Sequence, residues 1–515
     1  IMVDPDDFYK HFAVLAQTGA GKCVTPDTDI LMSDGSLKKI KKIFEDSNST
    51  IKESEDEELR MVNDCSIKSV NDEFELVDAD AVYAYRKKCN RILRIKTESG
   101  REIEVTEEHP LMVAENSYDF VEASEVDEGM HVAVPRKSDF KSTDNIQFSE
   151  DITNKIDSEN ERRRKLAKQF DKFETLEREG MGITTIAEDL DISKSTLENW
   201  KYCGSRPEVG QGFVMGERMK ALNIPKYVDA DLTEFMALIL AEGTEQQENS
   251  YRVIFTNNNE SLMQKFEELG SELFNLEPSK MRENAAYIDS ISLKYFLEEV
   301  GYETLQKSRS KSVPKPVMTS SRRPKRKFLR VFFDCEGSME DHEITLSSAS
   351  EEMINQISYM LLEFGIVSRI SSREKQATNS NHEGDIYYRI AISGVKQMQR
   401  FSKQIGFGID RKQERLENYL ATKEGNTNVD VIPIEGEYLK KERNKLGLSQ
   451  AKLGEKIGVH STLISLYERN ERRPSREKMG EMSEHLDSEM YSNLADSDLF
   501  WDKIESIEEV NHNGY

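Results

Sequence analysis

Residues 16–23 read Ala-Gln-Thr-Gly-Ala-Gly-Lys-Cys, which follows the pattern of a phosphate-binding loop up to its lysine and departs from it at the next position. Such a loop wraps phosphate with backbone N–H groups, holds the terminal phosphates with lysine, and then needs Ser or Thr for Mg²⁺. Gly19, Gly21 and Lys22 meet this pattern, whereas Cys23 replaces the hydroxyl. We therefore interpret residues 1–22 as a nucleotide site that is interrupted at Cys23.

The residues after Cys23 do not continue as the helix that a phosphate-binding loop requires. Pro26 breaks a helix, and Asp34-Gly35 predicts a hairpin turn between apolar strands. No strand with a catalytic acid follows the loop either. We therefore expect a new structural element to begin at Cys23, and we do not expect this chain to hydrolyse ATP.

Composition sets the outer limits of the prediction. The chain has 515 residues, 37% of them hydrophobic, so we expect several domains rather than one core. Its five cysteines form no CxxC pair, which argues against a disulfide framework or zinc site and favours the reducing cytoplasm. No apolar run approaches the roughly eighteen residues of a membrane span. Because the chain begins with Ile, we expect it to be a fragment at its front end.

Charge is unevenly distributed along the chain. The net charge of −25 argues against nucleic acid as a partner. From Lys307 to Arg330, however, basic residues recur with no acidic residue among them. A solvated surface is the simpler explanation of such a run. The alternative, which the motifs below favour, is a surface that binds nucleic acid.

Residues 23–140 are rich in short alternating strands. Residues 92–97 and 103–106 flank a Ser99-Gly100 turn and predict a hairpin. The second strand ends in Thr106, which His109 follows three residues later. A cysteine at a scissile bond attacks the preceding carbonyl, here that of Lys22, and two hydrogen-bond donors lower the barrier: one to the amide nitrogen, one to the developing oxyanion. His109 can supply the first and Thr106 can help with the second, although a histidine after a strand is more often structural.

Cys23 together with Thr106-x-x-His109 resembles the Hint fold shared by inteins and hedgehog-type processing domains. The resemblance implies protein splicing through an N-to-S acyl shift at Lys22-Cys23, with no cofactor. It also implies a host protein joined in cis, and residues 1–22 look like the P-loop of a HerA-type DNA-translocating ATPase. In that host, Gly19, Gly21 and Lys22 would bind nucleotide after splicing.

Two stretches have helix-turn-helix spacing. Residues 183–200 place apolar side chains at that spacing, with Ser193 as the expected N-cap of the second helix. Residues 447–469 resemble the repressor-type helix-turn-helix more closely. The side chains that we expect to contact DNA are Lys194, Ser195 and Asn199 in the first, and Gln450, His460, Ser461, Thr462 and Ser465 in the second. A plain helical hairpin in a linker is the alternative for the first stretch.

Between these stretches lie two similar segments, residues 234–243 and 327–337. Each is an apolar helix that ends in an acid and a glycine, with Glu242 and Glu336 as the two acids. The pair resembles the two LAGLIDADG helices of a homing endonuclease. The resemblance implies that the helices pack side by side and that their acids converge on duplex DNA. Either helix alone would be read as an ordinary buried helix.

The endonuclease resemblance also implies a metal, a catalytic lysine and a basic DNA surface. Glu242 and Glu336 would hold Mg²⁺, which prefers carboxylate and phosphate oxygens. Lys311 lies in a Lys-x-apolar-Pro segment like the one that carries the family's lysine near the cleavage centre. Val331 and Cys335 depart from the usual Gly and Ala, so nuclease activity could be weakened. The DNA-contacting residues would include Lys315, Arg322, Arg323, Lys325 and Arg326.

These patterns predict a multidomain α+β protein with an all-β Hint domain, an α/β two-motif endonuclease domain and two small all-α helix-turn-helix modules. The expected boundaries are 1–22 for the host fragment, 23–140 for the first Hint part, 141–222 for a linker with helix-turn-helix, 223–425 for the endonuclease, 430–490 for the second helix-turn-helix, and 491–515 for the return into the Hint domain. The family's last two strands, with their terminal Asn, should follow. We expect a cytoplasmic monomer that cuts double-stranded DNA in intein-free host alleles; the alternatives are a decayed intein without nuclease activity and a DNA-binding regulator.

Overall fold

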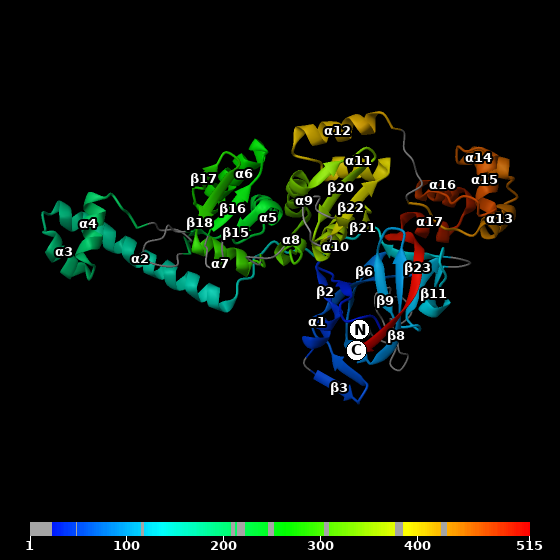
Figure 1. Ribbon diagram of the computed structural model, residues 1–515, viewed down its shortest axis with the longest axis horizontal. Coiled ribbons are helices and arrows are strands. Elements are labelled where there is room, and N and C mark those ends of the chain that lie inside the picture. Colours follow the sequence, from blue (N-terminus) through cyan, green and yellow to red (C-terminus); the bar gives the residue numbers. More distant parts are fainter. Residues whose placement is uncertain are drawn as a thin grey trace. The chain divides into compact units, whose positions relative to one another are not determined.

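The computed structural model describes residues 23–47, 49–114, 118–207, 212–213, 222–245, 252–302, 308–375, 385–423 and 430–514 (Figure 1). The predictions on residues 1–22 therefore lie outside the described residues. The chain forms two compact units. The first unit comprises Ile1–Thr143, Ser308–Ser312 and Glu336–Tyr515, and the second comprises Asp144–Lys307 and Val313–Cys335.

A six-stranded antiparallel sheet is the centre of the first unit. Its order is β11-β10-β12-β23-β8-β9. The strands are β8 (Cys89–Thr97), β9 (Glu102–Val105), β10 (Pro110–Ala114), β11 (Tyr118–Glu122), β12 (His131–Pro135) and β23 (Leu499–Gly514). Strands β10 and β12 are buried on both faces, because Leu111, Val113 and Val132 lie in one apolar cluster and Met112, Ala114 and Ala133 lie in another.

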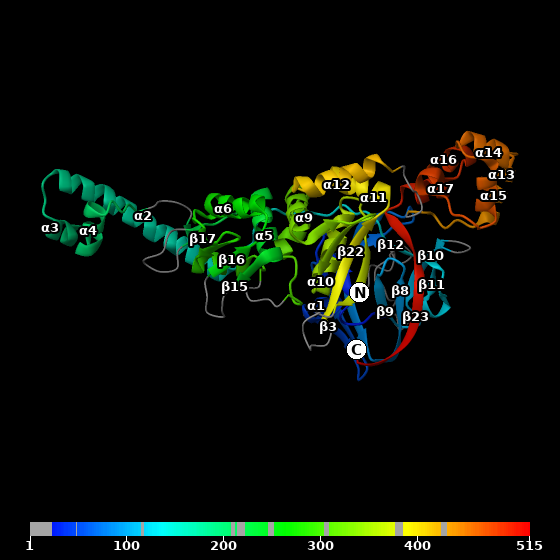
Figure 2. The same ribbon diagram turned by 45° about the horizontal axis from the view of Figure 1, so that its top comes forward.

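Strand β23 brings residues 499–514 back into the six-stranded sheet, as the return strand near residue 498 predicts. Its first part pairs with β12, from Leu499 opposite Pro135 to Lys503 opposite His131. Its second part pairs with β8, from Ile504 opposite Thr97 onward. Figures 1 and 2 both show β23 beside β8. Residues far apart in sequence thereby form one sheet.

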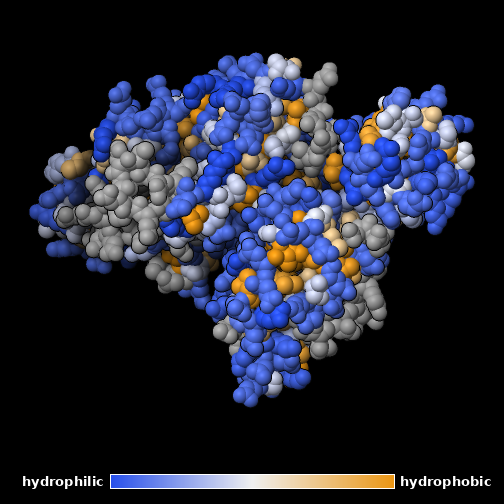
Figure 3. Space-filling model, turned by 45° about the vertical axis from the view of Figure 1, so that its right-hand side comes forward, coloured by the Kyte–Doolittle hydropathy of each residue, from blue (hydrophilic) through white to orange (hydrophobic). Residues whose placement is uncertain are grey.

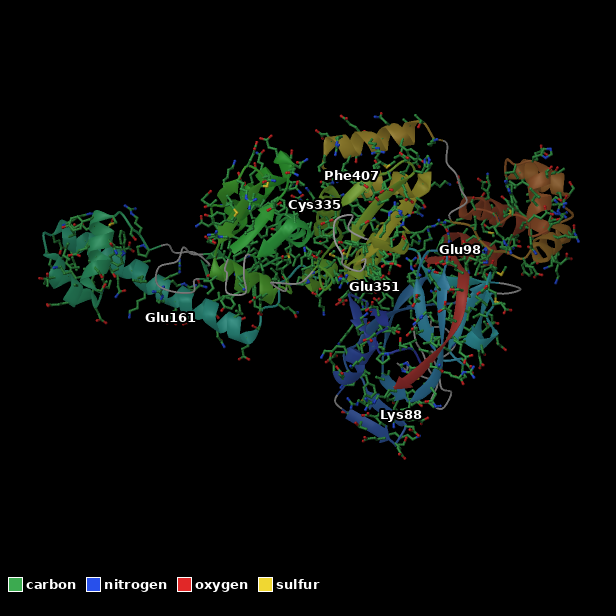
Figure 4. All side chains as sticks on the ribbon, in the orientation of Figure 1. Lys88, Glu98, Glu161, Cys335, Glu351 and Phe407 are labelled. Carbon is green, nitrogen blue, oxygen red and sulfur yellow. The ribbon has the colours of Figure 1, made fainter. Side chains whose placement is uncertain are left out.

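Both predicted hairpins of the first unit are confirmed. β1 (Asp29–Leu31) pairs with β2 (Leu37–Lys39), and Gly35 takes a φ of 84° in their turn. β8 pairs with β9 around Gly100, whose φ is 80°. Figure 4 labels Lys88 and Glu98, which precede and follow β8 at its opposite ends. Three smaller strands, β3 (Ser49–Glu53), β4 (Glu57–Met61) and β7 (Tyr83–Lys87), form a separate sheet, and β5 (Ser66–Val70) pairs with β6 (Leu76–Asp80). The short helices of this part are α1 (Ile40–Glu45) and η2 (Ala123–Glu125).

An internal repeat is distributed over the two units. In the second unit, α5 (Ala230–Glu242) leads into a sheet of order β15-β16-β18-β17, and in the first unit the end of α9 leads into a sheet of order β19-β20-β22-β21. The same order of elements in both supports a duplication. The elements of the first repeat are β15 (Gly243–Glu245), β16 (Arg252–Thr256), α6 (Glu260–Phe274), β17 (Ser279–Arg282), β18 (Ala285–Asp289) and α7 (Ile291–Glu299). Those of the second are α9 (Arg322–Glu336), β19 (Gly337–Met339), β20 (Glu343–Ser348), α10 (Glu351–Leu362), β21 (Arg369–Lys375), β22 (Asp385–Ser393), α11 (Val395–Gln404) and α12 (Asp410–Ala421).

The repeat extends to local helix starts. Asn259 caps α6 by accepting a hydrogen bond from the backbone N–H of Leu262, and Ser350 caps α10 by accepting one from Met353. Both residues follow the second strand of their repeat. Side-chain oxygens at this position satisfy N–H groups that the first helical turn leaves unpaired. The same cap chemistry at matching places supports the duplicated origin.

The predicted helix-turn-helix at 183–200 is present in the second unit. Helix α2 (Glu150–Arg178) precedes α3 (Ile183–Leu190) and α4 (Lys194–Tyr202), while β13 (Gly212–Phe213), β14 (Leu222–Asn223) and α8 (Lys315–Met318) complete the unit. Ser193 caps α4 by accepting from the N–H of Thr196, as predicted. Phe173 of α2 packs with Ile186 and Trp200 in a small core. Helix α2 therefore provides the third side of the small core, which α3 and α4 cannot enclose alone.

The second helix-turn-helix belongs to a five-helix segment of the first unit, the C-terminal helical segment below. It consists of α13 (Gly436–Lys445), α14 (Gln450–Lys456), α15 (Ser461–Glu468), α16 (Arg476–Leu486) and α17 (Glu489–Asp496). The turn between α14 and α15 is tight, because a Cβ at Gly454 would lie 2.6 Å from the carbonyl oxygen of Val459. Glycine at this position lets the two helices of the motif approach each other.

Candidate functional site

Cys23 and Thr106 lie against each other at the β9 edge of the six-stranded sheet. The backbone N–H of Cys23 donates to the Thr106 Oγ1 at 2.9 Å. In return, the Thr106 N–H donates to the carbonyl oxygen of Cys23 at 2.9 Å. The next residues, Val24 and Thr25, continue this pairing along β9, with the Thr25 N–H donating to Glu104. Residues 23–25 thus act as a short extra strand, which fixes the position of the Cys23 nitrogen.

The three-residue spacing between Thr106 and His109 is that of a β-turn. The His109 N–H donates to the Thr106 carbonyl oxygen at 3.0 Å, and the His109 carbonyl accepts from Ala123 at 2.8 Å. Both side chains are buried, with 6% of Thr106 and 3% of His109 exposed. The turn therefore holds both side chains inside the domain. The roles predicted for them at the Lys22 carbonyl stay predictions, because Lys22 is outside the described residues.

The Thr106 hydroxyl lies against the amide nitrogen of Cys23, a contact that the sequence did not predict. The hydroxyl oxygen is 2.9 Å from the Cys23 nitrogen and 3.4 Å from the Cys23 carbonyl oxygen. The prediction gave Thr106 to the oxyanion and His109 to the amide nitrogen. The contact that the structure places at the amide nitrogen is with Thr106, a placement that spacing alone could not give.

The Cys23 thiol is half-buried, and its environment favours the neutral form. Burial raises the pKa of Cys23 to about 11, and the neighbouring Cys89 and Glu108 act in the same direction while Lys87 opposes them. The thiolate is the nucleophilic form of cysteine. Attack by Cys23 therefore depends on removal of its proton during the reaction rather than on a standing thiolate.

Glu242 ends helix α5 in the second unit. Its Oε1 accepts a hydrogen bond from Asn257 Nδ2 at 3.1 Å. Asn257 directly follows β16, and the side chain of Glu242 is half-exposed. An oriented, accessible carboxylate is an oxygen ligand of the kind that Mg²⁺ prefers. Glu336, the last residue of helix α9, belongs to the first unit and is exposed.

The described residues contain no group of three or more His, Cys, Asp or Glu side chains placed to hold a metal ion. Proteins often bind Mg²⁺ through one or two carboxylates plus phosphate and water. Glu242 and Glu336 each carry the carboxylate oxygens that Mg²⁺ prefers. The same part of the chain has no helix with the length and apolar character needed to cross a bilayer.

The α5 and α9 helices lie side by side at their first turns, as the LAGLIDADG resemblance implies. Thr233 Oγ1 of α5 is 2.9 Å from the carbonyl oxygen of Pro324 in α9. Nearby, Glu234 is only 5% exposed and forms ion pairs with Lys265 at 2.6 Å and Lys327 at 2.9 Å. Burial alone would raise the pKa of Glu234, but hydrogen bonds from the two lysines outweigh it and hold the pKa below its usual value.

The basic stretch predicted to contact DNA is not uniformly exposed. Lys315, Arg322 and Arg323 are exposed, and Arg326 is half-buried. Lys325, in contrast, is 1% exposed, so its prediction as a surface DNA contact is wrong. Lys325 precedes Phe328 and Leu329 by one helical turn and shares their buried face of α9.

Lys311 lies in the first unit, where its carbonyl oxygen accepts from Ser350 Oγ at 2.5 Å. Its side chain is half-buried. The bond ties the segment before α8 to the cap of α10. The catalytic role predicted for Lys311 stays a prediction.

The predicted DNA contacts of the two helix-turn-helix motifs are mostly accessible. Exposed are Lys194, Ser195 and Asn199 on α4, with His460 and Thr462 at the start of α15, whereas Ser461 and Ser465 are half-buried. His460 caps α15 through its Nδ1. Gln450 differs, because its Nε2 donates to Glu468 at 2.6 Å beside the buried Arg443–Glu468 ion pair. The structure favours a structural role for Gln450 over the predicted DNA contact.

Comparison with known proteins supports two of the predicted modules. A family model described as a LAGLIDADG-like domain matches residues 323–406, and one described as helix-turn-helix matches residues 439–491. The first match covers α9 to α11 and the second covers most of the C-terminal helical segment. The helix-turn-helix match therefore includes α14 and α15, where the sequence places the recognition residues.

Curated relatives match over most of this chain but over a minor part of their own length. The replication factor C small subunit of Methanocaldococcus jannaschii is 26% identical over 85% of this chain and 19% of the relative. An A-type ATP synthase subunit of Pyrococcus abyssi is 26% identical over 88% of this chain and 36% of the relative. The chain thus spans about a fifth to a third of these relatives.

Solved structures resemble separate parts of the chain. The TvoVMA intein is 29% identical and covers 23% of this chain and 72% of its own, with a TM-score of 0.22. The structure of I-DmoI in complex with DNA and Mn is 16% identical and covers 35% of this chain and 97% of its own, with a TM-score of 0.26. These two solved structures each resemble one part of the chain, while the LAGLIDADG-like model matches residues 323–406 and the helix-turn-helix model matches residues 439–491.

Proposed function

We propose that the chain is an intein that splices at Lys22-Cys23 and carries a LAGLIDADG homing endonuclease for intein-free copies of its host gene. The observation that carries the splicing proposal is the 2.9 Å hydrogen bond from the Cys23 N–H to Thr106 Oγ1, with His109 one β-turn away. The nitrogen in this bond is the one that the reaction must release. The hydrogen bond holds the Cys23 nitrogen where a side chain of the protein can protonate it.

The proposed first step converts an amide to a thioester. Cys23 Sγ attacks the carbonyl carbon of Lys22, a carbon–sulfur bond forms, and the bond from that carbon to the Cys23 nitrogen breaks. The thiol proton leaves sulfur, and the nitrogen gains a proton to become a free amine, so atoms and charge balance. His109 is the proposed proton donor to this nitrogen, and Thr106 holds the nitrogen in place. No metal or cofactor is needed for this step.

The pattern of relatives supports an inserted element. Replication factor C and the A-type ATP synthase are different proteins, yet each matches 85% or more of this chain over a minor part of its own length. A segment shared in this way behaves as an insert in unrelated hosts. An ATP synthase agrees with a nucleotide-binding host, but neither relative is a HerA-type translocase, so the HerA-type host remains a proposal.

The endonuclease proposal rests on the LAGLIDADG-like match and on the duplicated fold. Glu242 and Glu336 would hold Mg²⁺, Lys311 would lie near the cleavage centre, and the exposed basic residues of α8 and α9 would contact phosphate. When bound, Mg²⁺ would stabilise the charge that develops on the scissile phosphate. The double-strand break at the uninterrupted P-loop sequence, after Lys22, is the proposed result. The monomeric state and the cytoplasmic location are proposals of the same kind.

Thiol-induced cleavage of the full chain tests the splicing proposal directly. Dithiothreitol should intercept the thioester and release a peptide of residues 1–22, which intact-mass spectrometry detects. Cys23→Ser is the matched variant: its oxygen ester is a much weaker target for a thiol, so release should fall sharply while the fold remains. Undiminished release from Cys23→Ala would overturn the proposal.

A DNA-binding regulator is the second candidate, and the helix-turn-helix match favours it. The two candidates differ in chemistry. A regulator binds duplex DNA but neither releases residues 1–22 with thiol nor cuts DNA with Mg²⁺. Binding without either reaction would therefore select the regulator.

A further inference from the structure

The C-terminal helical segment and the six-stranded sheet β11-β10-β12-β23-β8-β9, called the splicing sheet from here on, share one hydrophobic core. Buried side chains of β10, β12 and β23, including Met112, Ala133 and Trp501, lie in the same cluster as Ile464 of α15 and Met482 of α16. On the face that Figure 3 shows, the C-terminal helices are mostly hydrophilic. Their apolar residues thus serve the common core. Two elements that bury their apolar surface against each other are expected to unfold together.

Trp501 is the centre of an aromatic group in this core. Its ring centroid is 5.1 Å from that of Tyr118 on β11 and 6.3 Å from that of Phe74. The Tyr118 hydroxyl reaches the Pro433 carbonyl, just before α13, at 3.4 Å. The fluorescence of Trp501 therefore follows the folding of the splicing sheet at the place where the C-terminal helical segment packs on it.

Arg476, the first residue of α16, hydrogen-bonds to the start of β23 and to the residues just before it. Its guanidinium donates to the carbonyl oxygen of Leu499 at 2.7 Å, to Ser497 Oγ at 2.9 Å and to the Leu494 carbonyl at 2.5 Å. It also pairs with Asp430 at 3.0 Å. The planar fork of arginine, with five N–H donors, can satisfy all these acceptors together, whereas lysine cannot.

Arg136, one residue after β12, completes the same polar cluster from the sheet side. It is 5% exposed, donates to the Ser497 carbonyl at 2.7 Å, and lies 3.8 Å from Asp430. Burial, and next the neighbouring Arg476, lower the pKa of Arg136 to about 10. Asp430 thus lies between two arginines, one from the helical segment and one that follows the sheet. Buried charge pairs of this kind are costly to break from one side.

We propose that duplex DNA bound at α14 and α15 stabilises the splicing sheet through this shared core and the Arg476–Asp430–Arg136 cluster. The proposal rests on the proposed DNA binding of the helix-turn-helix. If the two parts unfold together, a ligand that binds only the folded helices must also shift the unfolding equilibrium of the sheet. At a duplex concentration 100 times the dissociation constant, the ratio of folded to unfolded chain rises about 100-fold. This change raises the thermal unfolding midpoint by on the order of 5 °C. The DNA occupancy of the homing module would thereby be sensed by the splicing domain.

Trp501 makes this measurable in the full chain. The chain has two tryptophans, and Trp200→Phe leaves Trp501 as the only one. Thermal unfolding is followed by Trp501 fluorescence with and without a random-sequence 30-base-pair duplex, a probe length of about three helical turns, in low salt without Mg²⁺. Binding is measured separately by fluorescence anisotropy of the labelled duplex. We expect the Trp501 midpoint to rise with duplex concentration.

Two variants separate coupling from binding elsewhere on the chain. Thr462→Asp puts a negative charge at the exposed start of α15, where it favours the helix and repels phosphate; it should abolish the midpoint rise while DNA still binds the endonuclease domain. Arg476→Lys should keep binding at α15 but reduce the rise. If the duplex binds in a way that depends on Thr462 but the Trp501 unfolding midpoint does not change, the inference is overturned while the DNA-binding role of this helix-turn-helix stands. Absence of any Thr462-dependent binding overturns the proposed DNA-binding role of this helix-turn-helix and the inference with it.

Discussion

The backbone nitrogen of Cys23 lies 2.9 Å from the hydroxyl oxygen of Thr106, a residue 83 positions further along the chain. We predict that Thr106→Ala slows thiol-induced release of residues 1–22, because the nitrogen that must be protonated loses the group that fixes it. One hydrogen bond of this kind is worth about tenfold in rate. Single-exponential rates from intact-mass spectrometry measure the effect.

Thr106→Ser is the control for this prediction. Serine keeps the hydroxyl and loses only a methyl group in a buried position, so it should recover most of the rate. If Thr106→Ser is as slow as Thr106→Ala, packing of the methyl group rather than the hydrogen bond determines the rate.

The raised pKa of Cys23 predicts a steep pH dependence of its reactivity. With the pKa of the folded protein at about 11, the thiolate fraction increases about tenfold per pH unit between pH 7 and 10 and does not level off in that range. In a model peptide with the usual cysteine pKa of about 8.5, the fraction levels off above pH 9. Alkylation of Cys23 by iodoacetamide, measured by peptide mass spectrometry, gives both curves. A plateau near pH 9 in the folded chain would contradict the buried environment.

The hydrogen bond between Asn257 and Glu242 orients this carboxylate, which predicts that Glu242 acts in DNA cutting and not in DNA binding. Glu242→Gln should leave duplex binding unchanged or slightly stronger, since a negative charge near phosphate is removed, while Mg²⁺-dependent cutting of the uninterrupted P-loop site falls from double-strand breaks to nicks or nothing. Glu336→Gln should do the same for the other strand. A supercoiled plasmid carrying the site distinguishes these products on a gel.

Asn257→Ala is the matched variant for Glu242, because it removes the amide that orients the carboxylate and keeps the charge. It should lower the cutting rate and raise the Mg²⁺ concentration needed, without changing binding. If Glu242→Gln weakens binding as much as it weakens cutting, the carboxylate has a structural role instead.

The unequal exposure of the basic residues on α9 predicts unequal effects on DNA binding. Arg322→Ala and Arg323→Ala should each weaken duplex binding and lower the slope of log affinity against log salt by about one, because each phosphate contact releases condensed counterions. Lys325→Met, at the 1% exposed position, should leave the slope unchanged. Salt titrations by fluorescence anisotropy give the slopes, and a reduced slope in Lys325→Met would contradict the burial of this side chain.

Local signals in the sequence predict the fold of this chain better than they predict the partners of its charged residues. The Ser99-Gly100 hairpin, the Ser193 cap and the return strand near residue 498 all appear in the structure, because turn and cap residues act over a few neighbours. Lys325 and Lys327 look alike in sequence, but one lies on the buried face of α9 and the other is paired with Glu234. The shared core around Trp501 depends on residues hundreds of positions apart, which no local pattern contains.

The ion pairs of Glu234 predict how the second unit responds to acid. The pKa of Glu234 is lowered in the folded state, where Lys265 and Lys327 hold the carboxylate. Its contribution to stability is therefore complete above the unfolded pKa of about 4.3 and is lost as the pH falls through the lower folded value. Glu234→Gln should destabilise the second unit at neutral pH by about 3 kcal/mol or more, since both lysines lose their partner, and this difference from the wild type should shrink as the pH falls below 4. Urea unfolding followed by Trp200 fluorescence in a Trp501→Phe background, at pH 7 and at pH 3.5, measures both values. A difference that is the same at both pH values would show that Glu234 stabilises the helices by packing rather than by its charge.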